Sequence, residues 1–350
     1  MHIADYIELL RRMIAIPSHS GEEDRVAAML ESWLQTRGLH CHRKGNNLWL
    51  DSADTRPCKG PAILLNAHID TVRPAASYTR DPYDPALEGD RIYGLGSNDD
   101  GASVVALLAA FEELTGKEQP YRLIWSATAE EENSGRGGME QLLPEIGHVD
   151  FGIFGEPTGM RLALAERGLM VLDCTAHGKS GHAAREEGDN AIYKALKDID
   201  WLRRYRFGRV SEFLGPVKMS VTMIEAGTQH NVVPDTCRFV VDVRPNGMYS
   251  NEEILQTIRE NVASDVTPRS MRRKSSHTDA SHPFVRRAAE LGFGTFGSPT
   301  LSNWALADFP AVKIGPGESS RSHGADEFVL RSEITSAIEG YVKLLDGFNL

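Results

Sequence analysis

Cysteine is scarce in this chain, and long apolar runs are missing from it. The four cysteines, Cys41, Cys58, Cys174 and Cys237, stand far apart and form no C-x-x-C pair, which argues against a thiolate zinc site or a disulfide framework. No run approaches the roughly 20 apolar residues of a membrane span, and the amino terminus lacks the basic and apolar segments of a signal peptide. We therefore expect reduced, structural cysteines, no membrane partner and a cytoplasmic location.

Basic residues are outnumbered. Lys and Arg total 38 against 49 Asp and Glu, so the net charge of −11 argues against a nucleic acid or an anionic membrane surface as partner. Hydrophobic content of 41% and charged content of 25% are typical of a globular protein. A length of 350 residues is long for one core and comfortable for two domains.

Several common catalytic motifs are incomplete. Gly178-Lys179-Ser180 resembles the end of a phosphate loop, but Asp173 stands where that loop needs glycine. Gly94-Leu95-Gly96 begins like a dinucleotide-binding motif, but Asp99 stands at its last glycine. The same stretch after Gly178 ends in His182 where a serine-hydrolase turn needs glycine, and no H-E-x-x-H occurs. Nucleotide binding and serine-hydrolase chemistry are therefore disfavoured.

Short polar clusters rich in possible metal ligands are present instead. They are Asn66 to Asp70, Ser97 to Asp100, Ala129 to Glu132, Gly155 to Thr158 and Ser322 to Gly324. Two imidazoles and three carboxylates neutralise most of the charge of two divalent ions without soft thiolates, and one carboxylate can bridge the pair. Each cluster alone would more often be a solvated loop. Together they predict a two-metal hydrolase.

Strand-like and helical segments alternate in the first part of the chain. Three strand-like runs each lead into a polar cluster or a candidate ligand: Pro61 to Asn66, Tyr121 to Thr128 and Phe151 to Phe154. The sequence Ser20-Gly21-Glu22-Glu23 has the form of a capping box before a helix that runs to Gly38. This alternation predicts an α/β fold with a largely parallel sheet, whose ligands lie beyond the carboxyl ends of the strands.

The pattern changes after about residue 162. Three segments are strand-like there: Gly168 to Thr175, Val217 to Ile224 and Cys237 to Val243. Two are helical: Asn190 to Arg204 and Asn251 to Ala263. Two helices beside an antiparallel sheet suit an inserted α+β domain. We therefore expect residues 1–161 and 275–350 to form a metal-binding catalytic domain and residues 162–274 to form the insert.

The order His, Asp, Glu-Glu, Glu, His resembles the M20 family of metallopeptidases and deacylases. The resemblance is nearest to its branch of acetylornithine deacetylases and succinyl-diaminopimelate desuccinylases. Three further stretches carry it: Gly178 to Ala183, Asn231 to Pro234 and Ser322 to Phe328. It implies a zinc-hydrolase domain, an inserted dimerisation domain, a homodimer and two divalent ions. Zinc is the first candidate, and cobalt and manganese suit the same ligands.

The resemblance also assigns the ligands. One ion would be bound by His68, Asp99 and Glu156, and the other by Asp99, Glu132 and His323. Asp70 would accept a hydrogen bond from the second ring nitrogen of His68 and orient the ring.

Three consecutive glutamates leave the register open by one residue. Aligning Glu130 to Gly137 with the family's D-E-E-x-G-S-x-G makes Glu131 the general base and Glu132 a ligand. A shift by one residue would choose Glu130 and Glu131 instead. The first register is preferred because it places Gly137 on the family's glycine.

Three residues of the insert complete the expected site. The resemblance implies that His182 reaches the partner subunit's active site and stabilises an oxyanion, with Asn231 assisting. Arg244 is a candidate for binding a substrate carboxylate, and a salt bridge on the sheet surface is an equal alternative for it.

The expected reaction is hydrolysis of the amide bond of an N-acyl amino acid. The resemblance favours N2-acetylornithine, with N-succinylornithine, N-acetylcitrulline and succinyl-diaminopimelate as alternatives. A di- or aminopeptidase with the same ions, or a non-catalytic metal-binding relative, is the rival interpretation. Asn303 stands where close relatives are expected to carry an acidic residue.

Overall fold

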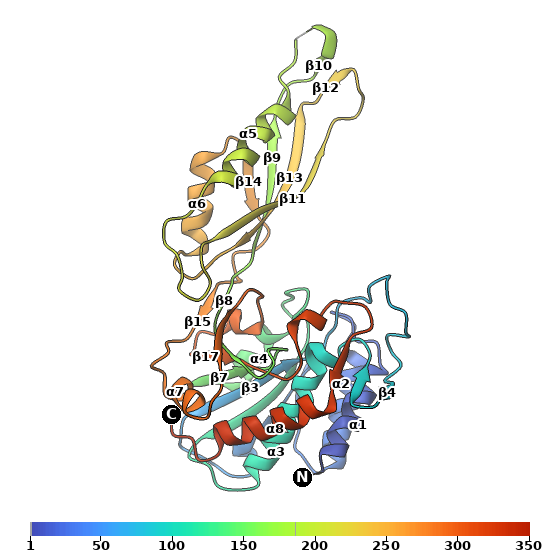
Figure 1. The fold of residues 1–350 in the computed structure, drawn as a ribbon, viewed down its shortest axis with the longest axis vertical. Coiled ribbons are helices and arrows are strands. Elements are labelled where there is room, and N and C mark those ends of the chain that lie inside the picture. Colours follow the sequence, from blue (N-terminus) through green and yellow to red (C-terminus); the bar gives the residue numbers. More distant parts are fainter. Residues whose placement is uncertain (1, 186) are drawn as a thin grey trace. The chain divides into compact units, whose positions relative to one another are not determined.

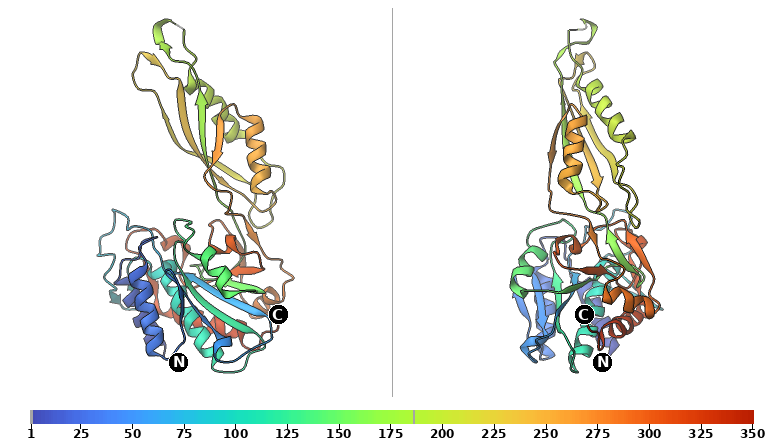
Figure 2. Two further views of the ribbon diagram at one scale, coloured as in Figure 1. Left: turned by 180° about the vertical axis from the view of Figure 1, so that it is seen from behind. Right: turned by 90° about the vertical axis from the view of Figure 1, so that its left-hand side faces the viewer.

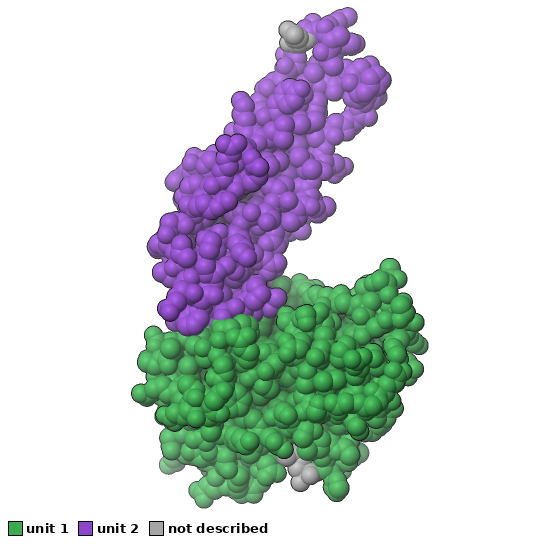
Figure 3. All heavy atoms as spheres, viewed as in Figure 1, with its two compact units in different colours: residues 1–164, 278–296, 302–350 green, residues 165–277, 297–301 purple. Residues whose placement is uncertain are grey.

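The computed structural model describes residues 2–185 and 187–350 (Figure 1). The chain divides into two compact units (Figure 3). Unit 1 comprises residues 1–164, 278–296 and 302–350, and unit 2 comprises residues 165–277 and 297–301. Among the described residues, no helix is long and apolar enough to cross a membrane.

Unit 1 is built on a mixed sheet whose central strands are parallel. Its strand order is β1-β2-β6-β3-β7-β17-β8, and β3 pairs in parallel with both β6 and β7. These strands are β1 (His42–Lys44), β2 (Asn47–Asp51), β3 (Ala62–His68), β6 (Arg122–Thr128), β7 (Phe151–Phe154), β8 (Leu162–Glu166) and β17 (Ala311–Lys313). Every residue of β3 and β7 is buried, as expected for strands covered on both faces. The predicted α/β fold with a largely parallel sheet is confirmed.

Helices cover both faces of this sheet (Figure 2). On one face α3 packs against the strands and against α1 and α8. Helix α3 is buried on nearly every side, which explains its almost entirely apolar sequence. On the other face α4 packs with Trp49, Phe154 and Trp304 in an apolar cluster. The helices of unit 1 are α1 (Ile3–Ile14), α2 (Asp24–Thr36), α3 (Ala102–Thr115), α4 (Met139–Ile146), α7 (Pro283–Glu290) and α8 (Arg331–Leu345).

Unit 1 also contains a small three-stranded sheet. The small sheet has the order β18-β5-β4. Its strands are β4 (Leu87–Glu88), β5 (Arg91–Tyr93) and β18 (Phe328–Leu330). The strands β8 and β16 (Thr295–Ser298) pair with each other and begin in unit 1 and end in unit 2, where β15 (Ser276–His277) pairs with the end of β8.

Unit 2 is an antiparallel sheet of order β11-β13-β9-β14 with two helices. These elements are β9 (Met170–His177), β11 (Lys218–Ala226), β13 (Thr236–Arg244), β14 (Asp265–Pro268), α5 (Ala191–Arg204) and α6 (Asn251–Asn261). Alternate residues of β9 and β13 are buried against both helices in a core of their own. A short ladder joins β10 (Gly181–His182) to β12 (Val232–Val233).

The predicted capping box before α2 is wrong. The N-cap of α2 is Glu23, and no side chain caps the helix. The hydroxyl of Ser20 donates instead to the Asp70 carboxylate, at 2.7 Å. The buried Glu23 carboxylate accepts from the backbone N–H of Gly21 and of Glu130. These side chains therefore form hydrogen bonds with loop residues and do not cap the helix.

Candidate metal centre

The carboxyl ends of three parallel strands bring the polar clusters together. His68 ends β3, the three glutamates follow β6, and Glu156 follows β7. Because neighbouring parallel strands end at the same edge of a sheet, these side chains converge. Asp99 lies in the irregular turn before α3, and His323 lies in the loop before β18.

The His68 imidazole is fully buried and fixed through both ring nitrogens. Its Nε2 lies 3.1 Å from Oδ1 of Asp99. Its Nδ1 lies 2.9 Å from the backbone oxygen of Asp70 and 3.4 Å from Oδ1 of the same residue. Burial alone would lower the pKa of His68, but the carboxylates of Asp70 and Asp99 raise it well above its usual value. Asp70 thus orients the ring mainly through its carbonyl oxygen.

The Asp70 carboxylate holds the turn that carries the glutamates. One of its oxygens accepts from the N–H of Glu131 at 2.9 Å, and the other accepts from the N–H of Glu132 at 3.0 Å and from Ser20. Burial would raise the pKa of Asp70, yet the contacts with His68 and these hydrogen bonds lower it. The residue remains ionised while it links β3 to the turn after β6.

Two groups of possible ligands share His68. One contains His68, Glu131 and Glu156, the other contains His68, Asp99 and Glu132, and in each group the ligand atoms lie within 4.8 Å of one another. Nε2 of His323 lies 3.0 Å from Oε1 of Glu132 and 3.7 Å from Oδ2 of Asp99. All the residues proposed from the sequence as ligands therefore come together in one cluster.

Burial and mutual repulsion dominate the electrostatics of this cluster. Burial, followed by the nearby carboxylates of Glu156, Glu132 and Asp70, raises the pKa of Glu131 well above its usual value. Burial also raises the pKa of Glu132, and the hydrogen bond to Glu132 raises the pKa of His323 to about 9. Crowded carboxylates and imidazoles of this kind are hard oxygen and nitrogen donors with excess negative charge. The donor set therefore fits a pair of divalent cations.

Glu130 serves a different purpose from its two neighbours. Its carboxylate turns back into its own loop and accepts from the N–H of Gly137 at 2.8 Å. A Cβ atom at Gly135 or Gly137 would lie only 1.9 Å or 2.2 Å from the nearer Glu130 carboxylate oxygen, so both glycines are needed where this side chain lies. Glu131 and Glu132 remain to face His68, Asp99 and Glu156.

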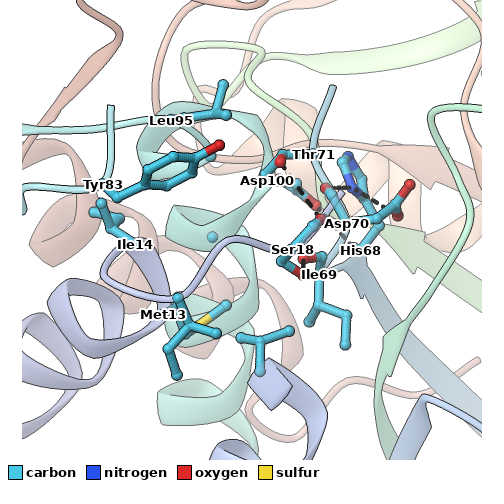
Figure 4. A pocket seen from close by; sticks show the side chains of 14 residues that line it. Met13, Ile14, Ser18, His68, Ile69, Asp70, Thr71, Tyr83, Leu95 and Asp100 are labelled. Carbon is cyan, nitrogen blue, oxygen red and sulfur yellow. Dashed lines mark hydrogen bonds and ion pairs between the residues drawn. The ribbon is translucent and has the colours of Figure 1, made fainter. Parts of the chain in front are cut away.

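A small cavity lies behind His68 and Asp70 (Figure 4). The polar side chains of His68, Asp70 and Asp100 lie on one side of it, and Met13, Ile14 and Leu95 lie on the other. The protein-facing side of the centre is therefore lined by apolar groups, which strengthen the electrostatic interactions of the buried polar ones.

Two peptidase family profiles match this chain. The profile of the peptidase dimerisation domain M20_dimer matches residues 164–268, and that of peptidase family M28 matches residues 52–143. The Peptidase M20 domain-containing protein of Schizosaccharomyces pombe is 27% identical, over 97% of this chain and 84% of its own length. Succinyl-diaminopimelate desuccinylase of Corynebacterium glutamicum is 26% identical, over 95% of this chain and 94% of its own length.

Solved structures show the same fold. Aminopeptidase PepT of Bacillus cereus superposes with a TM-score of 0.79 at 20% identity, covering 99% of both chains. The YXEP protein of Bacillus subtilis, a dinuclear metal binding peptidase from the M20 family, gives a TM-score of 0.74 at 16% identity, with 99% of both chains covered. The chain belongs to the M20 family. It is accordingly a metal-dependent hydrolase of the peptidase and deacylase group.

Sequence reasoning missed one buried carboxylate beside the candidate metal centre. Glu327 accepts from the N–H of Asn98 at 2.8 Å and of Asp99 at 3.0 Å, so it fixes the turn that presents Asp99. Burial, together with the charge of Asp99, raises its pKa to about 8. Its place four residues after His323 was the only available signal. The carboxylate of neighbouring Asp100 accepts a hydrogen bond from the N–H of His68, at 3.4 Å.

Asn303 joins the polar network beneath the candidate metal centre. The buried Nδ2 of Asn303 donates to Oγ1 of Thr128 at 3.0 Å and lies 3.5 Å from Oδ1 of Asn66. Asn66 in turn donates to Ser126 and Thr128. An amide donor therefore occupies the position where the sequence comparison led us to expect an acid.

The three site residues proposed from the inserted segment all lie in unit 2. His182 is exposed in β10, and the carbonyl of exposed Asn231 accepts from the N–H of Ala183. Arg244, at the end of β13, donates to both oxygens of Asp242, at 2.7 Å and 3.1 Å. The salt bridge considered for Arg244 is thus present on the sheet.

Proposed function

We propose that this M20 protein hydrolyses the amide bond of an N-acyl amino acid with two divalent metal ions, zinc being the first candidate. His68, Asp99 and Glu156 would hold one ion, and Asp99, Glu132 and His323 the other. The observation that carries the proposal is the convergence of these donors: His68 lies within ligand distance of Glu131 and Glu156 on one side and of Asp99 and Glu132 on the other, and His323 lies beside Asp99 and Glu132. When bound, such ions polarise a carbonyl group and make water acidic enough to react near neutral pH.

In this proposal Glu131 transfers a proton as a general base and then as a general acid. The water oxygen forms a bond to the amide carbon, Glu131 accepts a proton from that water, and it returns the proton to the nitrogen as the C–N bond breaks. The products are a carboxylate and an amine. Burial and the nearby carboxylates raise the pKa of Glu131, and a raised pKa makes its carboxylate a stronger base.

The inserted segment, residues 162–274, is proposed to be a homodimerisation domain. Its edge strand β11 exposes Met223 and Ile224, which are 63% and 56% accessible. Helix α5 exposes Tyr193 and Leu196, at 67% and 50%. An edge strand flanked by exposed apolar side chains is suited to pairing with a second copy. In that dimer, exposed His182, assisted by Asn231, would donate a hydrogen bond to the oxyanion in the partner's site.

The substrate proposal rests on the names of the relatives. The C. glutamicum relative is a succinyl-diaminopimelate desuccinylase, so N-succinyl-diaminopimelate joins N2-acetylornithine as a leading candidate for this chain. Both are N-acyl amino acids that carry a carboxylate and a second amino group. Arg244 is the proposed carboxylate anchor, and substrate would have to replace Asp242 as its partner.

A substrate panel tests the function. We expect kcat/KM of the zinc-loaded protein for N-succinyl-diaminopimelate or N2-acetylornithine to exceed that for neutral dipeptides by roughly 10–150-fold, the discrimination that one charged contact of ~1.5–3 kcal/mol with the second amino group would provide. Arg244→Met should raise KM for every acyl-amino acid. Its matched control, Asp242→Asn, removes the same salt bridge but leaves the guanidinium free, so KM should not rise. Faster turnover of dipeptides than of all acyl-amino acids would contradict the deacylase proposal.

A further inference from the structure

A second group of metal-ligating side chains lies on unit 1, apart from the M20 centre. Nδ1 of His40 lies 3.2 Å from Oδ2 of Asp54, and Nε2 of His42 lies 2.7 Å from the same oxygen. The three ligand atoms all lie within 4.8 Å of one another. His40 and Asp54 are exposed and His42 is half-buried, so solvent reaches the group.

The local fold fixes this arrangement. His42 begins the edge strand β1 and pairs with Trp49 of β2, and Asp54 ends the short helical turn Ser52–Asp54 that follows β2. The His42 ring stacks on the buried indole of Trp49, with ring centres 5.1 Å apart and planes 10° apart. The His40 ring meets the His42 ring edge-on, with centres 4.6 Å apart. Rings held in this way lose little conformational freedom when they bind an ion.

We propose that His40, His42 and Asp54 bind one borderline transition-metal cation, with zinc as the first candidate. At zinc–ligand distances near 2.1 Å, tetrahedral ligand atoms are about 3.4 Å apart. The His40 and His42 nitrogens lie 3.2 Å and 2.7 Å from the shared Asp54 oxygen, so small side-chain movements bring these atoms to that spacing. Each neutral imidazole binds through the nitrogen that faces Asp54 and keeps its proton on the other nitrogen, and water completes the coordination.

A simple His–Asp pair elsewhere in the chain shows what distinguishes this group. His148 lies 3.1 Å from Asp150, so that pair has one imidazole and one carboxylate. In the proposed site two imidazoles converge on one carboxylate oxygen. Burial would raise the pKa of Asp54, but the hydrogen bonds from His42 and His40 lower it, so the carboxylate stays ionised. The bound ion would connect the edge strand β1 to the turn after β2.

Calorimetric titration of the protein with zinc tests the site. We expect wild type to bind one more equivalent of zinc per chain than His42→Asn or Asp54→Asn, or to bind that equivalent at least ~10-fold more tightly. Removing an outer-shell partner already lowers metal affinity by at least that factor, so removing a ligand should cost no less. His148→Asn, the matched control, should behave as wild type. The comparison does not depend on how many ions the M20 centre holds, and retained hydrolase activity shows that each variant is folded. Equal stoichiometry and affinity in wild type and both variants would overturn the proposal.

Discussion

A glutamate can bind a metal ion, transfer a proton or stabilise a loop. These three roles are proposed for Glu132, Glu131 and Glu130, respectively. Glu130 fills the loop that ends at Gly137, whereas Glu131 and Glu132 face the cluster around His68. The sequence alone left the register open because three identical side chains carry no positional information. The close approach of Gly135 and Gly137 to the Glu130 carboxylate supplies a physical reason for the register preferred here.

The buried amide of Asn303 contributes to stability as a hydrogen-bond donor. Asn303→Asp should reduce the free energy of unfolding by about 1–3 kcal/mol, because a carboxylate cannot donate to Thr128 and would be buried beside the oxygen of Asn66. Urea unfolding at pH 7 measures this loss. Asn349→Asp, at an exposed position, should change stability by less than about 0.5 kcal/mol. An unchanged midpoint for Asn303→Asp would show that the amide is not needed as a donor.

At the scale of elements, periodicity predicted most of what the structure contains. The buried run before His68 and the alternating strands β9 and β13 lie where the apolar pattern placed them, because burial on one or both faces leaves a direct trace in sequence. The predicted capping box is wrong because its residues have partners that lie far away in the sequence. Ser20 donates to Asp70 and Glu23 accepts from Glu130, and only the fold brings these residues together.

The candidate site was predictable to the extent that its residues belong to short motifs. His68, Asp99 and Glu156 each sit in a recognisable cluster, whereas Glu327 acts through backbone N–H groups 228 and 229 positions away. No periodicity or spacing encodes such a contact. Short motifs therefore pointed to the proposed ligands, while the residues that hold those ligands in place required the fold.

At the scale of the whole molecule, the cluster links folding to pH. In the metal-free protein, the raised pKa values of Glu131, Glu327 (about 8) and His323 (about 9) mean that the folded chain holds protons which the unfolded chain releases earlier. The free energy of unfolding should therefore fall as pH rises from about 4.5 to about 9. The lowered pKa values of Asp70 and Asp99 act in the opposite direction, but only below about pH 4.

Urea midpoints of chelator-treated protein at pH 5, 7 and 9 test this prediction. The midpoint should decrease along the series, and the decrease should be smaller for Glu327→Gln, whose amide oxygen still accepts from the N–H of Asn98 and Asp99. Added zinc should offset the decrease, since metal ions bind the deprotonated ligands. A midpoint that rises between pH 5 and pH 9 would contradict the assigned shifts.

The proposed dimer makes a further prediction for the whole molecule. His182→Ala in both subunits should nearly abolish turnover, and so should Asp99→Ala. Mixing the two inactive proteins should restore some activity, because an exchanged heterodimer contains one site with intact ligands and an intact His182 from the other subunit. Subunit exchange is followed independently by mass spectrometry of differently labelled chains. Confirmed exchange without returning activity would show that His182 does not act across the interface.

Parallel turnover and zinc measurements on three neighbouring variants test whether two divalent ions and a separate carboxylate base share this cluster. Glu131→Gln should lower kcat by about 10²–10⁴-fold with zinc content near wild type. Glu132→Gln should lose zinc, whereas Glu130→Gln, whose amide oxygen can still accept from Gly137, should keep both zinc and most of the turnover. Zinc loss in Glu131→Gln together with normal zinc in Glu132→Gln would contradict the account.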